Sequence, residues 1–391
     1  MRRRSQSPRA VVTAFNDSRG VCDPDHHATI GWAYSLDNGE TWVGGGGLPE
    51  SRSLNNGDPW LGVSPDGQTF YLSGLWDFGH GFGFYRGALT KTGIEWSPPT
   101  IVAPAIPIFP RDKEAFTVDP NSGTIYLTYT SFDTSGIFAV RSDDQGQTWC
   151  PPEPVFLGPA QGSFPAVDNQ GNLFVAYRVG LNSLSVSVSS DGAASFQPLV
   201  SFPLQMTSVS YVDRSSQFPQ IAVDNSRGDH DGWVYLVWHG GTETGDSRIY
   251  ISHSEDGGST WLAPFQINSD ATIAYRWWPS VSVDSNGSAN LISLDRRNHP
   301  GTGLTDCFFA QSTDGGNSFT EIQVTDVTSS WEGIRHDPGF TYAGDYIRAV
   351  SQATSVYAVW TDPRNGDPDI YFSRLDAGGF AAAKSSLVGA R

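Results

Sequence analysis

The sequence predicts an all-β protein that folds as a single β-propeller of seven four-stranded antiparallel blades, with six blades as the alternative. Two observations lead to this fold. One short phrase recurs five times along the chain, and 43 Gly with 25 Pro in 391 residues favour short strands and tight turns over long helices. Aromatic residues make up 13% of the chain, which excludes disorder as its main state.

The recurring phrase reads Ser-x-Asp-x-Gly-x-Thr-Trp, and we call its copies the repeat turns. The three complete copies are Ser35–Trp42, Ser142–Trp149 and Ser254–Trp261, and the two altered ones are Ser189–Phe196 and Ser312–Phe319. Asp and Gly favour a tight hairpin turn, and the Asp side chain can accept hydrogen bonds from the amides of that turn. Five equivalent sites cannot all be one active centre, so we interpret these Asp residues as structural.

Two apolar alternations around a short turn precede the repeat turns, as in residues 218–224 and 233–238. A third strand leads into the repeat turn and a fourth follows it, which gives a meander of about 45–65 residues, the size of a propeller blade. The first unit begins at its second strand, so we expect its inner strand to be missing and residues 384–388 to complete a blade. The single domain, residues 1–391, divides into units near 10–48, 58–102, 112–156, 162–202, 217–268, 277–326 and 340–388.

Charge and composition exclude several classes of partner. The net charge of −17 disfavours nucleic acid and anionic membrane surfaces, and no apolar run reaches the length of a membrane span. No zinc-like Cys and His spacing and no phosphate-binding Gly loop occurs, so we expect no metal and no cofactor. No signal peptide is readable after Met1. We expect a secreted or extracytoplasmic protein whose leader is absent from this numbering, with the cytoplasm as the alternative; the oligomeric state is not predicted.

The repeat turns resemble Asp-box (BNR) repeats, and the chain resembles the sialidase-like β-propeller superfamily over nearly its full length. The resemblance implies that the boxes lie on the outer rim, between the third and fourth strands of each blade. The phrases Gly57–Trp60, Asp112–Phe116 and Gly344–Ile347 are similar to those of secreted bacterial BNR proteins described as exo-sialidases. We therefore expect a carbohydrate-active protein that acts on an anionic oligosaccharide or polysaccharide, in the first place a sialidase-like glycoside hydrolase. The alternatives are a uronate-directed polysaccharide lyase and a non-catalytic propeller that binds glycan or protein.

Residues at the starts of the innermost strands line one mouth of a propeller's channel. Arg binds carboxylates in a bidentate fork, and aromatic faces stack on sugar rings. Arg348 is the strongest single indication of a binding site. When the inner strands are aligned with one another, the other strands have an apolar residue at the position that Arg348 occupies. The residues expected to bind substrate are Arg111, Lys113, Arg276, Arg348, Trp60, Trp277 and Asp345.

A sialidase needs three Arg on the substrate carboxylate, a Tyr nucleophile with a Glu beside it, and an Asp acid. The resemblance assigns Arg111, Arg276 and Arg348 to the carboxylate and Tyr346 to the nucleophile. Glu114 or Glu332 is then the carboxylate beside Tyr346, and Asp58 or Asp112 is the acid. The Arg-Ile-Pro phrase that carries the first Arg in sialidases does not occur here. A lyase would instead use His80, in a Gly-rich aromatic loop, or His336 as its proton-transfer group.

Overall fold

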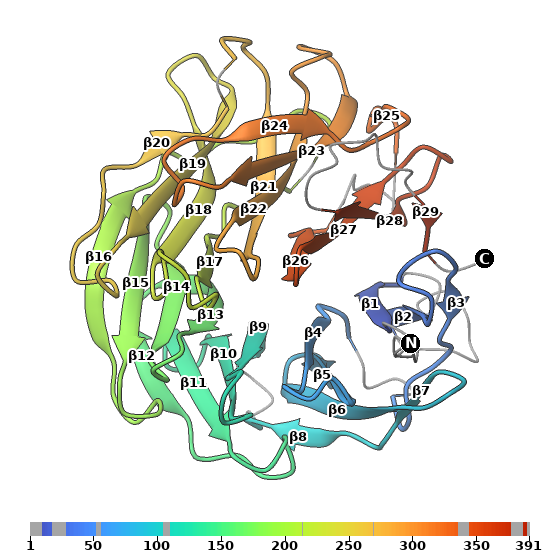
Figure 1. Cartoon of the computed structure of the whole chain (residues 1–391), viewed down its shortest axis with the longest axis vertical. Coiled ribbons are helices and arrows are strands. Elements are labelled where there is room, and N and C mark those ends of the chain that lie inside the picture. The colour runs from blue at the N-terminus through green and yellow to red at the C-terminus, as the bar shows by residue number, and fades with distance from the viewer. Residues whose placement is uncertain are drawn as a thin grey trace, which may run out of the picture.

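The computed structural model describes residues 10–17, 29–51, 56–104, 110–212, 214–268, 270–334, 344–376 and 386–388. Seven antiparallel sheets stand radially around a central axis, so the predicted seven-bladed β-propeller is confirmed (Figure 1). The described residues contain no helix that is long and apolar enough to cross a membrane.

Blades 1 to 4 follow one another along the chain, and the strands of each blade run outward from the axis in sequence order. Blade 1 has β1 (Val11–Asn16), β2 (Ile30–Ser35) and β3 (Val43–Gly44). Blade 2 has β4 (Trp60–Val63), β5 (Thr69–Trp76), β6 (Gly81–Leu89) and β7 (Ile94–Trp96), with β8 (Thr100–Val102) also paired to β6. Blade 3 has β9 (Arg111–Val118), β10 (Ile125–Ser131), β11 (Gly136–Ser142) and β12 (Glu153–Leu157). Blade 4 has β13 (Ala160–Val167), β14 (Leu173–Val179), β15 (Ser183–Ser189) and β16 (Gln197–Pro203).

Blades 5 to 7 have the same order of strands. Blade 5 has β17 (Gln220–Val223), β18 (Val234–Gly241), β19 (Ser247–Ser254) and β20 (Phe265–Gln266). Blade 6 has β21 (Arg276–Val283), β22 (Ala289–Asp295), β23 (Leu304–Ser312) and β24 (Thr320–Gln323), with β25 (Ser329–Ser330) also paired to β23. Blade 7 has β26 (Arg348–Gln352), β27 (Ser355–Asp362), β28 (Asp369–Asp376) and β29 (Ser386–Leu387).

Blade 1 has three strands where the other blades have at least four. In blades 3 to 6 a repeat turn follows the third strand, whereas in blade 1 the repeat turn Ser35–Trp42 follows β2. The strands β1 to β3 are therefore the second to fourth strands of a blade, and no described strand occupies the innermost place. The expectation that residues 384–388 fill it is corrected, because β29 pairs with β28 as the outermost strand of blade 7.

The ring is closed at its rim by the repeat turn of blade 1. The ring of Phe372, on β28, lies so close to Gly39 that a Cβ there would come within 2.3 Å of it, and it meets the ring of Trp42 at 4.9 Å. The hydroxyl of Tyr357 donates to Asn38 Oδ1 at 2.5 Å. Gly146 and Gly316 approach Phe84 and Tyr235 of the preceding blades in the same way. These repeat-turn glycines have φ of +80 to +92°, so both backbone conformation and space require Gly there.

Each repeat turn is held by its Ser and Asp side chains, as in Ser142–Trp149. Ser142 Oγ donates to Asp144 Oδ1 at 2.8 Å and accepts from the amide of Gly146 at 2.8 Å. Asp144 also accepts from the amide and the hydroxyl of Thr148, at 2.8 and 2.6 Å. These hydrogen bonds to the charged form lower the pKa of Asp144 to about 2, the bond from the Thr148 hydroxyl first.

Replacing Asp144 by Asn should remove the negative charge of this side chain and leave it one acceptor oxygen in place of two. We expect Asp144→Asn to lower the Tm at pH 7 by about 1–2 °C, because exposed hydrogen bonds contribute modestly. An Asp whose pKa is lowered in the folded state stabilises the fold above its unfolded pKa of about 3.9 and loses this effect as the pH falls through about 2. Thermal melts of the variant and of the wild type should therefore converge at about pH 2. The exposed Glu95→Gln is the control, and a difference in Tm that persists unchanged at pH 2 would contradict the charged role of Asp144.

Candidate functional site

The inner strands enter the mouth of the channel through a recurrent backbone irregularity. Asp58, Lys113 and Trp278 have left-handed φ of 53, 53 and 48°, and Gly162 takes the equivalent place in blade 4 with a φ of 70°. The register of the inner strand with its neighbour slips at this point in blades 3, 4 and 6. Left-handed non-glycine residues are strained and concentrate at functional sites. Here they turn the side chain of Asp58, just before β4, and that of Lys113 on β9 toward each other.

Lys113 lies buried at the centre of the mouth. Its Nζ is 2.5 Å from Asp58 Oδ2 and 2.5 Å from Asp345 Oδ2, so one ammonium group bridges two carboxylates. Lys113 belongs to blade 3, Asp58 precedes blade 2 and Asp345 precedes blade 7. Asp58 is fixed in turn by Asn16 of blade 1, whose Oδ1 accepts from the Asp58 amide at 2.7 Å. The expected site residues Asp58, Lys113 and Asp345 are thus brought together from distant parts of the chain.

Blade 5 completes this cluster. Arg214 donates to Asp345 Oδ2 at 2.7 Å, and the Ser216 hydroxyl donates to Asp345 Oδ1 at 2.6 Å. Burial opposes ionisation of Asp345, but the charges of Lys113 and Arg214 hold the pKa of this carboxyl below its ordinary value. We call Asp58, Lys113, Arg214 and Asp345 the mouth cluster.

Two further carboxyl groups flank Lys113 and behave differently. Burial raises the pKa of Glu114 well above its ordinary value, and neither of its oxygens finds a hydrogen-bond partner in another described residue. Burial also raises the pKa of Asp112, with the charge of Lys113 opposing this shift and that of Asp58 adding to it. Asp112 Oδ2 accepts from Gln161 Nε2 at 3.2 Å and is half-buried. Two carboxyl groups with a raised pKa therefore lie beside Asp345, whose pKa is lowered.

Aromatic rings pack below the mouth cluster. The Trp60 ring lies 5.2 Å from the ring of Phe164 and 6.0 Å from that of Tyr346, and its Nε1 donates to Phe116 O at 2.8 Å. The guanidinium of Arg348 lies over the Trp60 ring at 4.6 Å, a cation–π contact. Trp60 of blade 2 therefore contacts residues of blades 3, 4 and 7.

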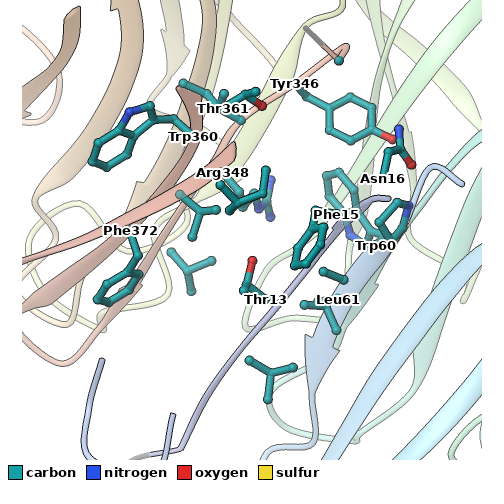
Figure 2. Close-up of a pocket in the computed structure, with 18 of the residues that line it drawn as sticks. Thr13, Phe15, Asn16, Trp60, Leu61, Tyr346, Arg348, Trp360, Thr361 and Phe372 are labelled. Carbon is teal, nitrogen blue, oxygen red and sulfur yellow. The ribbon is translucent and has the colours of Figure 1, made fainter. Parts of the chain in front are cut away.

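Arg348 is open to the channel, as its place in the sequence predicts. Its one hydrogen bond to a described residue is long, 3.4 Å from Nη1 to Gln220 Oε1. The side chain is exposed to solvent, yet protein surrounds it, and this enclosure lowers its pKa to about 10. Arg348 therefore stays charged at neutral pH. It lines a cavity of about 1200 Å³ together with Trp60, Tyr346, Arg214 and Asp345 (Figure 2).

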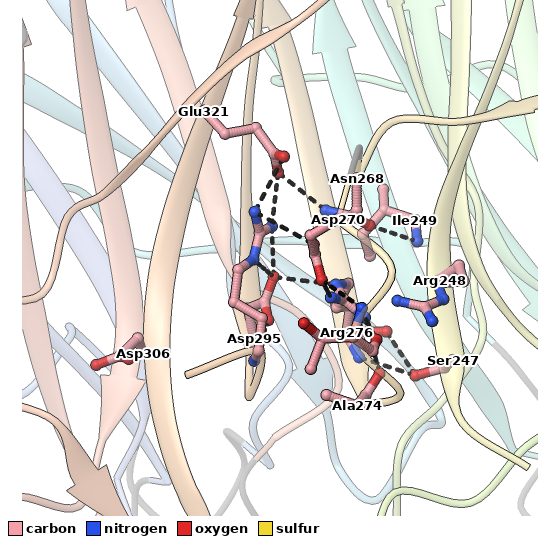
Figure 3. Close-up of polar contacts among 12 residues, drawn as sticks. Ser247, Arg248, Ile249, Asn268, Asp270, Ala274, Arg276, Asp295, Asp306 and Glu321 are labelled. Carbon is pink, nitrogen blue, oxygen red and sulfur yellow. Dashed lines mark hydrogen bonds and ion pairs between the residues drawn. The ribbon is translucent and has the colours of Figure 1, made fainter. Parts of the chain in front are cut away.

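The structure places the other expected arginines elsewhere. Arg276 is fully buried in blade 6, where it pairs with Asp270 Oδ1 at 2.6 Å and with Asp295 Oδ2 at 3.3 Å (Figure 3). Arg297 extends this network to Glu321. Arg276 is neutralised and inaccessible, so the expected convergence of Arg111, Arg276 and Arg348 on one carboxylate is corrected.

Arg111, Trp277 and His80 also lie away from the mouth cluster. The guanidinium of Arg111 contacts Ala103 O and lies over the ring of Tyr129 at 5.0 Å. Trp277 is fully buried, with the guanidinium of Arg296 at 4.8 Å from its ring centre. His80 Nδ1 is 3.1 Å from Asp77 Oδ2 in the loop between β5 and β6. Glu332 accepts from the amide of Gly303 at 2.7 Å in blade 6, and His336 lies outside the described residues.

Four residues of this site are absent from the sequence-based set. Arg214 comes from the segment that leads into β17, Gln220 is the first residue of β17, Gln161 lies at the start of β13, and Arg178 lies near the end of β14. Arg178 donates to Gln161 Oε1 at 3.2 Å and lies over the ring of Phe218 at 4.9 Å. Gln161 and Gln220 stand at the starts of inner strands, where the same argument from position would have found them. Arg214 follows no repeated pattern. Among the described residues, no group of three or more His, Cys, Asp or Glu side chains is arranged to hold a metal ion.

No protein-family model matches the chain, and no curated protein matches it in sequence. Solved structures do match. A protein from Lactobacillus plantarum is 13% identical, with 97% of this chain and 95% of that chain covered and a TM-score of 0.53. A PL25 ulvan lyase bound to -[GlcA(1-4)Rha3S]- is 10% identical, with 85% and 84% covered and a TM-score of 0.53. The Hadza microbial sialidase Hz136 is 15% identical, with 90% and 74% covered and a TM-score of 0.48. The first two likenesses, with TM-scores of 0.53, agree with the propeller fold, and at such identities they bear on the fold alone.

Removing the central ammonium tests whether Lys113 is structural. Lys113→Met leaves two buried carboxylates facing each other, and we expect the free energy of unfolding to fall by about 3–5 kcal/mol. Urea unfolding at pH 7 measures this loss, and the exposed Lys91→Met is the matched control. If Lys113→Met unfolds at the same urea concentration as the wild type, the contacts of Lys113 with Asp58 and Asp345 do not stabilise the fold. A role of Lys113 in binding a ligand would then be favoured.

Proposed function

We propose that this protein binds an anionic saccharide at the mouth of its channel, with Arg348 as the group that recognises the carboxylate or sulfate of the sugar. One observation carries the proposal: Arg348 is a charged, solvent-accessible guanidinium inside a large cavity, and it lies over the Trp60 ring at 4.6 Å. A buried or enclosed cation that lacks a carboxylate partner is costly, so a ligand anion would stabilise it.

The surroundings suit a sugar. The cavity is lined largely by apolar and aromatic side chains, against which pyranose faces can stack, and polar groups cluster at its mouth. Arg214 lines the same cavity and adds a second positive charge to it. The ulvan lyase that shares this fold is bound to a saccharide that contains glucuronate and a sulfated rhamnose, which is a ligand of the proposed class. Such ligands are met outside the cell, which supports secretion of the protein.

Removing the guanidinium should weaken binding of an acidic saccharide. A charge-assisted hydrogen bond contributes about 1.5–3 kcal/mol, so we expect Arg348→Ala to raise Kd by about 10- to 100-fold. Titration calorimetry with sialyl and uronic-acid oligosaccharides measures this, with neutral oligosaccharides of equal length as the ligand control. Arg374→Ala, at the rim of blade 7, is the matched variant and should bind as the wild type does. Equal affinity for neutral and acidic sugars, or an unchanged Kd for Arg348→Ala, would refute the proposal.

Cleavage of the bound saccharide is the second candidate, and Asp112 favours it. Its raised pKa and its half-buried place at the mouth suit a general acid, which must be protonated near neutral pH to give its proton to a leaving oxygen. Glu114 is more deeply buried and suits a supporting role. A sialidase-like hydrolase would use Tyr346 as its nucleophile, whereas a uronate lyase would release an unsaturated product.

Asp112→Asn separates binding from cleavage. We expect this variant to bind an acidic saccharide with a Kd within about threefold of the wild type and to lose cleavage by at least 100-fold, because general acids contribute about 10²–10⁴-fold. Released reducing sugar indicates a hydrolase, whereas ultraviolet absorbance of an unsaturated uronate product indicates a lyase. Asp143→Asn, on the outer rim, is the control. If the wild type binds but releases no product from any acidic glycan, the protein is a binding propeller; if Asp112→Asn cleaves at the wild-type rate, Asp112 is not the acid.

A further inference from the structure

A second arginine at the mouth has no carboxylate partner among the described residues. Arg178, near the end of β14, lies opposite Gln161 in the register of β13 and β14, which places it at the mouth end of blade 4. Arg178 is partly exposed, and no carboxylate of a described residue forms an ion pair with it. Other arginines at the mouth ends of blades 5 and 6 each pair with an Asp: Arg248 with Asp246, Arg276 with Asp270, and Arg297 with Asp295.

Uncharged groups hold Arg178 in place. Its guanidinium lies over the ring of Phe218, just before β17 of the neighbouring blade 5, at 4.9 Å from the ring centre (Figure 1). The ring packs so closely on Gly162 that a Cβ there would come within 2.1 Å of it. Nη2 of Arg178 donates to Gln161 Oε1 at 3.2 Å, and Nε is buried without a hydrogen-bond partner among the described residues. The guanidinium is therefore positioned before any ligand binds, which lowers the entropic cost of binding.

The surroundings of Arg178 disfavour its charge. Burial lowers the pKa of Arg178, and the positive charge of Arg214 lowers it further, whereas the negative charge of Asp345 raises it by less. A guanidinium nevertheless stays protonated in proteins. An anion bound at Arg178 would therefore offset both the burial of this charge and its repulsion by Arg214.

Arg178 and Arg348 contact the same segment of blade 5. Arg178 lies over Phe218, and Nη1 of Arg348 donates to Gln220 Oε1 at 3.4 Å. The two contacted residues are two positions apart, so their Cα atoms are separated by at most about 7 Å. Arg348 lines the large cavity and Arg178 lies outside its lining, whereas Arg214 lines the cavity and also acts electrostatically on Arg178. The mouth therefore has two separate but neighbouring positions that favour an acidic group.

We propose that Arg178 is a second anion-binding position, and that the bound saccharide carries acidic groups on more than one of its sugar residues. This inference rests on the proposed function, in which Arg348 binds the first carboxylate or sulfate. Arg178 binds the carboxylate or sulfate of another residue of the same saccharide, since a guanidinium donates charge-assisted hydrogen bonds to either group. The ligand class is therefore a repeating acidic polysaccharide, a polyuronate or a sulfated uronate chain, and not a glycan with a single terminal acid.

Matched pairs of saccharides test the second position. One pair is a galacturonate trimer and the same trimer with all but one carboxyl group methyl-esterified. The other is the disaccharide GlcA(1-4)Rha3S, the repeat bound by the ulvan lyase, and its desulfated form. By titration calorimetry with the full chain, we expect the fully charged member of at least one pair to bind about tenfold more tightly than its partner, or better. Arg178→Ala should abolish this difference, whereas Arg178→Lys, which keeps the charge, should retain part of it.

Arg374→Ala, at the rim of blade 7, is the control and should keep the whole difference between the two members of a pair. Binding of the single-acid ligands by Arg178→Ala shows that this variant is folded, because Arg348 binds them. The inference is overturned if both members of each pair bind the wild type equally, or if Arg178→Ala keeps the difference. Failure of the proposed function gives another result: no acidic ligand binds, or Arg348→Ala leaves the Kd of every ligand unchanged.

Discussion

Lys113 connects blades that the polypeptide does not join at this point. Its ammonium group lies between a carboxylate before blade 2 and one before blade 7, so the bridge passes the innermost place of blade 1. Buried ion pairs are seldom stabilising by themselves, because desolvation offsets the attraction. Here the cost is reduced because Ser216 donates to Oδ1 of Asp345 and Arg214 donates to Oδ2, the oxygen that Lys113 also contacts. Together with the rim contact of Phe372 on Gly39, this cluster links the blades on either side of blade 1, where no described strand occupies the innermost place.

The same cluster determines the electrostatics of the mouth. Lys113 is paired with Asp58 and Asp345. Its charge lowers the pKa values of the adjacent Asp112 and Glu114 by less than burial raises them. The pKa values of Asp112 and Glu114 are therefore raised although a lysine lies between them in the chain. The cluster at the mouth thus has two carboxyl groups with a raised pKa beside it, and the guanidinium of Arg348 is open to the channel.

The repeat turns make most of the fold predictable from the sequence. Ser142, Asp144 and Thr148 satisfy one another within seven residues, so their pattern is local and repeats wherever the third strand ends. The site is less predictable because its contacts are long-range. Arg276 and Arg348 are each the first residue of an inner strand. Arg276, however, is neutralised by Asp295, the last residue of the next strand. No pattern around Arg276 itself indicates that partner.

Backbone irregularity explains the different places of Arg111 and Lys113. The left-handed φ of Lys113 breaks the alternation of β9, so the side chain at 113 enters the mouth whereas that at 111 packs on Tyr129. Alternation alone would have placed both on one face of the strand. Glycine normally marks such a conformation in a sequence, as Gly162 does in blade 4, but an Asp or a Lys in that place gives no sign of it.

The cavity that results has two chemically distinct parts. Its mouth carries the ionic groups, and its length along β1 lies between largely apolar walls. A saccharide of the proposed class can contact the ionic groups of the mouth through its acidic group and the aromatic rings below through its ring faces. The separation follows from the fold, because the inner strands begin at the mouth, where polar side chains gather, and mainly apolar side chains pack below it.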